Sequence, residues 1–173
     1  LSLFALFWQA HWLVKAVMLG LLASSVWVWA IVIDKFMLYT RTRKAMEAKG
    51  LDLILVSDPS NMAWLTGYDG WSFYVHQGVL LGLEGEPVWW GRGMDAQGAK
   101  RTVFMHHDNI VGYDDTYVQN PQKHPMKQLA QVIRERGWDQ GRIGVEMDNY
   151  WFSAAAWETL HGQLDTASFT DAT

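Results

Sequence analysis

The chain has 173 residues, of which 50% are hydrophobic and 18% are charged, with 11 tryptophans, no cysteine and a net charge of -4. These values exclude a disulfide-bonded miniprotein, a zinc-thiolate site and a basic protein that binds nucleic acid, so we expect no nucleic-acid partner. A chain this aromatic and this low in charge is also not disordered.

The charge is distributed unevenly along the chain. Residues 1–43 carry a balance of +3, whereas residues 44–173 carry -7. Residues 16–33 (AVMLGLLASSVWVWAIVI) contain no charge, and as a helix they are about 27 Å long, close to the thickness of a hydrocarbon core. A signal peptide normally places its positive charges before a shorter apolar stretch, and a core helix rarely lacks charges on every face. The sequence therefore predicts a transmembrane helix with a juxtamembrane segment over residues 1–43.

The residues that flank this span predict its orientation. Five charged residues, four of them basic, follow it closely: Asp34, Lys35, Arg41, Arg43 and Lys44. Because Lys and Arg concentrate on the cytoplasmic side of a membrane, we expect the N-terminus outside and the C-terminal part in the cytoplasm. Trp8 and Trp12 suit the aromatic belt of a membrane interface. Ala16, Gly20 and Ser24 recur every four residues, a spacing that lets a partner helix approach closely and that chance produces about as readily.

Residues 6–43 (LFWQAHWLVKAVMLGLLASSVWVWAIVIDKFMLYTRTR) resemble the first membrane helix of the TolQ/ExbB family of proton-channel subunits. The resemblance implies membrane-helix partners and a single-pass location in the inner (cytoplasmic) membrane. It does not imply channel activity, because that family needs further membrane helices and this sequence has one apolar span. If the helix is an artefact of fusion, we expect a cytoplasmic protein instead.

After Lys44, short apolar runs alternate with helical periods, which is typical of an α/β domain. Apolar runs bounded by turn residues predict strands over residues 51–56, 79–83, 88–90, 109–113, 142–147 and 167–170. Helical periods bounded by cap residues predict helices over residues 39–49, 59–66, 94–104, 125–136 and 154–164. The strands over 79–83 and 88–90 are expected to form a hairpin around a polar turn. Residues 114–124 are polar and interrupted by Pro121, so we expect an exposed loop there.

Three stretches of this second part resemble the N-terminal domain of the creatinase/prolidase family, the companion of the pita-bread catalytic domain: residues 46–68 (MEAKGLDLILVSDPSNMAWLTGY), 85–90 (GEPVWW) and 142–160 (RIGVEMDNYWFSAAAWETL). Within the family, the likeness is strongest to ectoine hydrolases, through residues 58–77 and 107–126. For residues 44–173 the resemblance implies a three-layer α/β domain with a mixed sheet between helices. It also implies a homodimer through this domain.

The resemblance also assigns the chemistry. Family members hydrolyse their substrates in a C-terminal domain, where carboxylates and a histidine hold two metal ions, and this chain ends at Thr173, before that domain. Because Leu1 is not methionine either, we expect a truncated or composite chain. We therefore expect a non-catalytic domain that shapes a substrate pocket or mediates dimerisation, with no catalytic residues and no cofactor of its own. Divalent metal ions are expected only in the missing catalytic domain. The alternative is a membrane-tethered interaction module related to TolQ/ExbB subunits.

The substrate-binding residues that we predict belong mainly to the loop over residues 67–77. Four of its side chains, those of Tyr68, Trp71, Tyr74 and His76, would form an aromatic wall and a hydrogen bond for the delocalised cation of a small zwitterion such as ectoine. Arg92 would bind its carboxylate. Such a substrate is expected only together with the missing domain. The alternative is that these aromatic residues pack against a core or a domain interface.

Two acidic or metal-binding patterns have simpler interpretations. His106, His107 and Asp108 are adjacent, so their side chains diverge, and we expect a solvated loop end instead of a metal site. Glu146 and Asp148 share one face of an extended strand, as an acid/base pair requires. Without a cleft or an electrophile, we expect them to lie at a solvated strand end.

Overall fold

The computed structural model describes residue 8, residues 11–120 and residues 122–173. The chain divides into two compact units, Leu1–Arg41 and Thr42–Thr173, whereas the sequence predicted a division between residues 43 and 44. Pro121, the residue expected to interrupt the polar loop, lies outside the described residues, as do residues 6, 7, 9 and 10 of the TolQ-like stretch.

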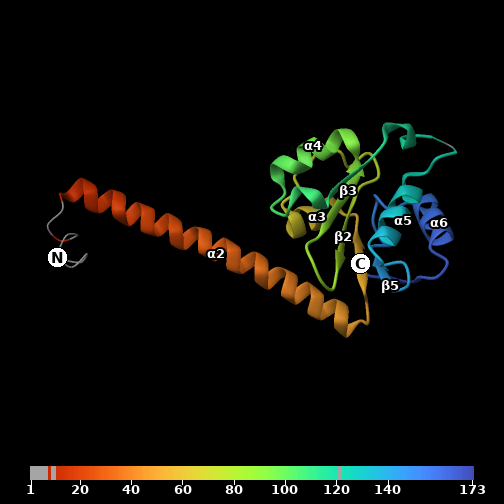
Figure 1. Ribbon diagram of the computed structural model, residues 1–173, viewed down its shortest axis with the longest axis horizontal. Helices are drawn as coiled ribbons and strands as arrows, with labels where there is room; N and C mark the ends of the chain where they lie inside the picture. Colours follow the sequence, from red (N-terminus) through yellow and green to blue (C-terminus); the bar gives the residue numbers. More distant parts are fainter. Residues whose placement is uncertain (1–7, 9–10, 121) are drawn as a thin grey trace. The chain divides into compact units, whose positions relative to one another are not determined.

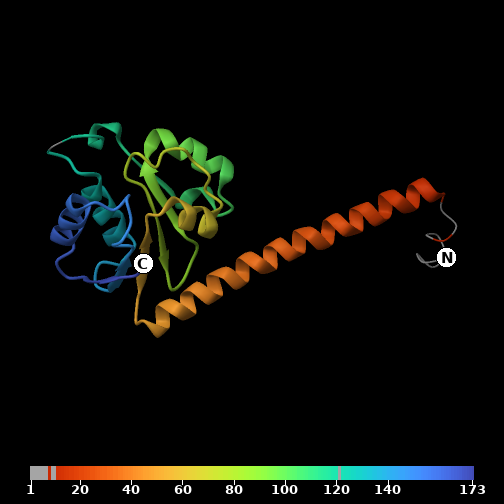
Figure 2. The same ribbon diagram turned by 180° about the vertical axis from the view of Figure 1, so that it is seen from behind.

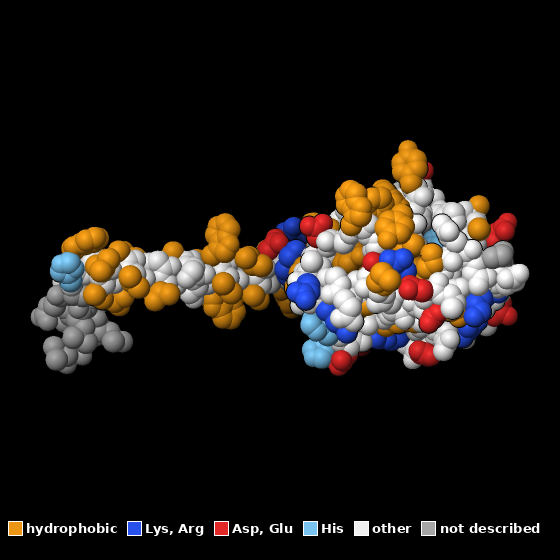
Figure 3. Space-filling model, turned by 90° about the horizontal axis from the view of Figure 1, so that it is seen from above, with side chains coloured by type: hydrophobic (Ala, Val, Ile, Leu, Met, Phe, Trp, Pro, Cys, Tyr) orange, Lys and Arg blue, Asp and Glu red, His pale blue; other side chains and the backbone are white. Residues whose placement is uncertain are grey.

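Helix α2, Trp12–Ala48, joins the predicted membrane helix and the predicted helix over residues 39–49 without a break (Figure 1). Gly50 follows it with a φ of 65°, a left-handed conformation that glycine adopts without strain and that ends helices. An 18-residue window of α2 has a mean hydropathy of 2.3 and is 0% buried, so by length and composition this helix is able to cross a membrane. Figure 3 shows many hydrophobic side chains along the visible face of this segment.

The second unit is built on a six-stranded mixed sheet in the order β4-β3-β2-β1-β5-β6. Its strands are β1 (Leu53–Val56), β2 (Gly78–Gly82), β3 (Val88–Arg92), β4 (Ile110–Tyr113), β5 (Arg142–Val145) and β6 (Ser168–Asp171). The strand β2 pairs antiparallel with both β1 and β3, and the other pairs are parallel. The predicted hairpin is therefore confirmed, and so is the mixed sheet.

Helices cover both faces of this sheet (Figures 1 and 2). They are α3 (Pro59–Thr66), α4 (Gly93–Thr102), α5 (Pro125–Glu135) and α6 (Ala154–Gln163), with short 3-10 helices η1 (His107–Asn109) and η2 (Asp115–Tyr117). The helices α3 and α4 lie on one face, and α5 and α6 lie on the other. The adjacent residues Trp89 and Trp90 on β3 point to opposite faces, where Trp89 stacks near Tyr68 and Trp90 near Tyr113.

The main core lies between the sheet and the α5–α6 pair. In α5 the spacing of Met126, Leu129, Val132 and Ile133 puts them on one face of the helix, and all four are buried. Across the sheet, alternate residues such as Leu53 and Leu55 of β1 join the same cluster. Burial of this cluster is the main contribution that holds the α5–α6 layer on the sheet.

Local cap chemistry fixes where the helices begin. Asp58 accepts hydrogen bonds from the backbone N–H groups of Ser60 and Asn61 and so caps α3, which Gly67 ends with a φ of 77°. Ser153 accepts from the backbone N–H of Ala156 and caps α6 in the same way. The helices α3 and α6 therefore begin at Pro59 and Ala154, as the sequence predicted.

The loop over residues 114–124 differs from its prediction as a simple exposed loop. It contains the helix η2, and Tyr117 and Val118 in it are partly buried against the main core. The reason is that an aromatic and a β-branched side chain in this polar stretch find apolar neighbours once the sheet has formed.

Candidate functional site

The strand directions place the loops that follow the parallel strands at the same end of the sheet. Five of the six described strands run in the same direction, and β2 is the reversed one. The carboxyl ends of these five strands therefore lie at the same end of the sheet, together with the amino end of β2. In open α/β sheets, ligands bind in crevices outside these carboxyl ends.

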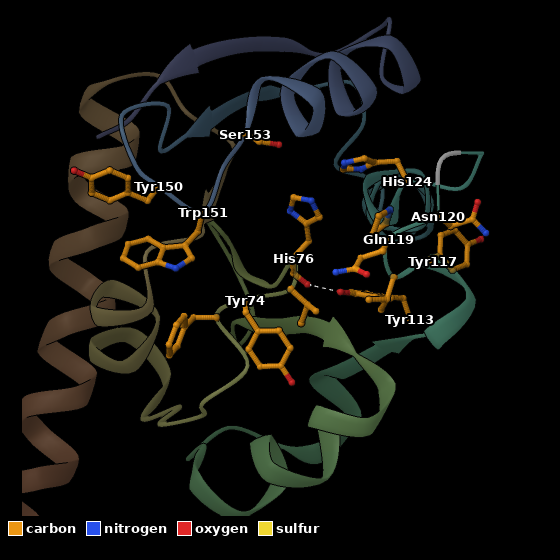
Figure 4. A pocket seen from close by; sticks show the side chains of 14 residues that line it. Tyr74, His76, Tyr113, Tyr117, Gln119, Asn120, His124, Tyr150, Trp151 and Ser153 are labelled. Atoms are coloured by element: carbon orange, nitrogen blue, oxygen red, sulfur yellow. Dashed lines mark hydrogen bonds between the residues drawn. The ribbon is translucent and has the colours of Figure 1, made fainter.

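A cavity of about 680 Å³ lies at this edge, formed by loops that are far apart in the sequence (Figure 4). Six aromatic side chains line it: Phe73, Tyr74, Tyr113, Tyr117, Tyr150 and Trp151. Five polar side chains and three aliphatic ones complete the lining: His76, Gln119, Asn120, His124, Ser153, Val75, Val118 and Pro125. The described lining contains no lysine, arginine, aspartate or glutamate. Its volume and its mixture of aromatic and polar groups are those of a small-molecule site.

Two histidines face each other in this cavity. The rings of His76 and His124 lie 4.7 Å apart between centroids. Burial, followed by the nearby His124, lowers the pKa of His76 to about 4. Burial also lowers the pKa of His124, with a further contribution from Lys127. Both imidazoles are therefore neutral at pH 7, and the described lining carries no formal charge at that pH.

Two polar residues of the cavity are also helix caps. The Nδ1 atom of His124 accepts a hydrogen bond from the backbone N–H of Met126 at 3.2 Å, at the start of α5. The Oγ atom of Ser153 accepts from the backbone N–H of Ala156 at 3.2 Å, at the start of α6. Tyr113 is engaged as well, since its hydroxyl donates to the carbonyl oxygen of His76 at 2.7 Å. These bonds hold the three side chains in place without a ligand.

The structure places two of the five predicted site residues, Tyr74 and His76, in the described lining of this cavity. Trp71 is 82% exposed, and its ring lies 5.0 Å from that of Phe73. Tyr68 is 3% exposed and belongs to a buried polar cluster, where its hydroxyl lies 2.5 Å from the Oγ of Ser72. Burial raises the pKa of Tyr68 above its ordinary value, so this phenol stays neutral.

Arg92, the predicted carboxylate ligand, is paired within the protein. Its Nε lies 2.9 Å from Oδ2 of Asp95 and 3.7 Å from Oδ1 of Asp115. Its Nη2 donates to the hydroxyl of Tyr74 at 3.3 Å. The hydrogen bond to Asp95 raises the pKa of Arg92 above its ordinary value. Two carboxylates of the same chain thus already surround this guanidinium.

Sequence reasoning missed most of the cavity. Tyr113 stands at the end of a predicted strand, Tyr117 and His124 stand in the predicted exposed loop, and no binding role was predicted for Trp151. One signal was present: residues that follow a strand and cap the next helix lie at the carboxyl ends of the parallel strands. His124 and Ser153 both satisfy that description.

The prediction that Glu146 lies at a solvated strand end is wrong. Glu146 is 7% exposed. Its Oε2 accepts from the backbone N–H groups of Ser57 at 2.7 Å and Asp58 at 2.8 Å, and its Oε1 accepts from the side-chain amide of Asn61 at 2.6 Å. The parallel pairing of β5 with β1 brings these donors to the carboxylate. Glu146 therefore holds the start of α3 to the end of β5.

The cluster at His106 has no metal-binding geometry. Nδ1 of His106 accepts from the backbone N–H of Asp108, and both side chains are exposed. Over residue 8 and the ranges 11–120 and 122–173, no group of three or more His, Asp or Glu side chains is arranged to hold a metal ion. The described side chains thus do not fit the two-metal site that the resemblance assigns to the family's catalytic domain.

Comparisons with known proteins show the family and the fold of this chain. A family model described as the creatinase/prolidase N-terminal domain matches residues 39–173. The chain is similar to the ectoine hydrolase of Halomonas elongata, with 62% identity over 133 residues, which cover 76% of this chain and 33% of that protein. It is 35% identical to an uncharacterized hydrolase/peptidase of Sinorhizobium fredii over 76% of this chain and 34% of that protein. The chain thus spans about one third of the length of these relatives.

Solved structures show the same fold at low sequence identity. An Xaa-Pro dipeptidase from Bacillus anthracis superposes with a TM-score of 0.61 and 16% identity, over 80% of this chain and 34% of that one. A proline dipeptidase from Streptococcus pneumoniae has a TM-score of 0.59 and 23% identity, over 77% of this chain and 89% of that one. The family match begins at residue 39. The TolQ/ExbB resemblance of residues 6–43 is not shown by these matches and stays a prediction.

Proposed function

The chain belongs to the creatinase/prolidase N-terminal domain family, and from this premise we propose that residues 42–173 act as the non-catalytic N-terminal domain of an ectoine-hydrolase-like metallohydrolase. In this role the domain supplies one wall of the substrate pocket, and a catalytic domain supplies the metal and the hydrolytic chemistry. The observation that carries the proposal is the 62% identity to an ectoine hydrolase over three quarters of the chain.

The chemistry of the cavity supports this role. Ectoine is a small cyclic amidine with a delocalised cation and a carboxylate. Aromatic faces such as those of Tyr74 and Trp151 attract a delocalised cation. The described lining has no charged side chain, so the protein does not pay the large free-energy cost of burying an unpaired charge in this cavity. Tyr150, one of the lining residues, is 96% exposed, so its ring is accessible to a second domain.

Complementation tests the proposal. The full chain in detergent is mixed with the remaining two thirds of the Halomonas elongata ectoine hydrolase, and ectoine hydrolysis is measured with added divalent metal. We expect hydrolysis in the mixture and none from the full chain alone. The control is a mixture of the relative's own two parts.

Two results would contradict the proposal. Hydrolysis by the full chain alone would show that the domain is catalytic. A silent mixture, under conditions where the relative's own two parts hydrolyse ectoine, would show that this domain does not replace its counterpart.

We also propose that α2 anchors this domain as a single-pass helix in the cytoplasmic membrane, with the domain in the cytoplasm. The support is the hydropathy of its 18-residue window, none of which is buried, and the basic residues that follow the apolar stretch. We expect the chain to stay in the membrane fraction after alkaline carbonate extraction. Its release into the soluble fraction would contradict the anchor.

A further inference from the structure

The cavity has two chemically different ends. Figure 4 shows Tyr74 and Trp151 toward one end and His124 and Ser153 toward the other, with His76 between them. The first end presents aromatic rings. The second end is more polar: His124 and Ser153 form hydrogen bonds there, and the side chains of Gln119, Asn120 and Tyr117 lie on the same side as His124. A ligand with two different ends therefore has one preferred direction in this cavity.

His124 presents a hydrogen-bond donor. Its Nδ1 accepts from the backbone N–H of Met126 at 3.2 Å, so Nδ1 carries no proton. A neutral imidazole with an unprotonated Nδ1 carries its proton on Nε2. Burial lowers the pKa of His124, which keeps the ring neutral at pH 7. Its remaining polar group is thus the Nε2–H donor.

Ser153 presents a donor for the same reason. Its Oγ accepts from the backbone N–H of Ala156 at 3.2 Å, which uses a lone pair and leaves the hydroxyl proton for a partner. His124 and Ser153 therefore offer N–H and O–H groups at one end of the cavity. Hydrogen bonds from such donors are stronger to a charged acceptor than to a neutral one. This end suits a carboxylate.

Arg92 does not take that role. Its guanidinium is paired with Asp95 at 2.9 Å and Asp115 at 3.7 Å. The Cζ atom of Arg92 lies 5.8 Å from the centroid of the Tyr74 ring, and Arg92 is not among the described residues that line the cavity. A ligand carboxylate at Arg92 would have to compete with two carboxylates of the protein.

We propose that the cavity binds a small zwitterion in one direction and does so without the catalytic domain, in contrast to the expectation from the sequence. The delocalised cation lies against Tyr74 and Trp151, and the carboxylate lies on Nε2 of His124 and Oγ of Ser153. This inference rests on the proposed function, because it states which end of the cavity binds the cation of the substrate and which end binds its carboxylate. It replaces Arg92 by His124 and Ser153 as the residues that select a carboxylate.

A pair of ligands tests the direction. Ectoine and the cyclic amidine in which a hydrogen replaces the carboxylate of ectoine are titrated calorimetrically into the full chain in detergent. The wild-type chain should bind ectoine at least tenfold more tightly than the amidine. The substitution Ser153→Asp keeps a good helix cap but places a negative charge at the carboxylate end. It should weaken ectoine binding at least tenfold and leave amidine binding equal or tighter.

Two further variants make the result specific. Ser168→Asp adds the same charge at an exposed position at the start of β6, the opposite edge of the sheet, and should leave the ratio of the two affinities unchanged. His124→Asn keeps an acceptor for the N–H of Met126 and removes the ring donor, so it should reduce the preference for ectoine. It also serves as the test if Ser153→Asp does not fold, which the thermal midpoint of each variant reports.

Three outcomes would overturn the inference: no binding of either ligand to the wild-type chain, equal effects of Ser153→Asp and Ser168→Asp, or a preference that Arg92→Gln removes and Ser153→Asp keeps. The complementation assay separates this failure from that of the proposed function. If the mixture hydrolyses ectoine and Ser153→Asp leaves its KM unchanged, the function stands and the binding direction is wrong. If the mixture does not hydrolyse ectoine and the affinities change as expected, the binding direction is supported and the proposed function is wrong.

Discussion

The two compact units contain the same kinds of apolar side chain and place them in opposite surroundings. In α2, Leu22 is 63% exposed and Trp27 is 72% exposed, whereas in the second unit Leu129 and Trp89 are fully buried. The second unit buries its apolar side chains in a core, whereas residues 16–33 of α2 contain no charged residue and are exposed. This difference supports the proposed membrane anchor, because exposed apolar surface of this extent is unfavourable in water.

The largest effect that we expect comes from the same substitution made in both units. Leu129→Ala removes a fully buried side chain from the main core and should cost about 2–5 kcal/mol of unfolding free energy. Leu22→Ala should leave the unfolding of the second unit unchanged, because that side chain is outside its core. Urea unfolding in detergent, followed by near-UV circular dichroism, measures both. Equal losses for the two variants would show that α2 shares the core.

A charge within the apolar stretch of α2 should affect membrane insertion and leave the stability of the second unit unchanged. Val26→Lys places an ammonium within the uncharged span and should weaken membrane insertion by about 3 kcal/mol. The fraction of the chain that resists carbonate extraction should fall, while the unfolding midpoint of the second unit stays the same. Val26→Leu is the matched control. An unchanged membrane fraction for Val26→Lys would contradict the proposed anchor.

Removal of the buried carboxylate should destabilise the second unit alone. Glu146→Ala leaves the backbone N–H groups of Ser57 and Asp58 without their acceptor and should cost about 2–3 kcal/mol. Glu146→Gln keeps one acceptor oxygen and should cost less. The unfolding free energies of the two variants check this order, and a loss below 0.5 kcal/mol, about the size of an ordinary surface substitution, would show that water replaces the carboxylate.

The smallest effect that we expect is a pH dependence of the unfolding free energy of the second unit, which arises from His76 in the cavity. His76 has a pKa of about 4 in the folded chain and an ordinary value of 6.5 when unfolded. Between these values the unfolded chain binds more protons, so the stabilisation is complete above pH 6.5 and is lost as the pH falls to about 4. The loss should be on the order of 2 kcal/mol. His76→Gln should flatten this part of the stability curve, and an unchanged curve would contradict the neutral state of His76.

Local chemistry made much of the fold predictable from the sequence. Asp58 before Pro59, Ser153 before an alanine run and Gly67 after a short helix each determine a helix end through atoms within a few residues. The apolar face of α5 follows from its spacing in the same way. Strand positions were predicted to within a few residues because turn residues bound them.

The cavity was less predictable because its parts converge through the sheet. Tyr74 and His76 come from one loop and were found together. His124 and Trp151 join them only once β4, β5 and β1 have taken their places, and nothing in the sequence states that order. Glu146 was misjudged for the same reason, since its donors belong to the segment after the neighbouring strand β1.

The most direct test of the binding cavity is an NMR titration of the indole N–H groups. The full chain, labelled at its 11 tryptophans and held in detergent micelles, is titrated with ectoine, and the substitution Trp151→Phe assigns the signal of the cavity. We predict that the Trp151 signal moves with ectoine concentration. The signals of Trp138 and Trp157, which pack against the core outside the cavity lining, should stay in place. A stationary Trp151 signal at saturating ectoine would contradict the account.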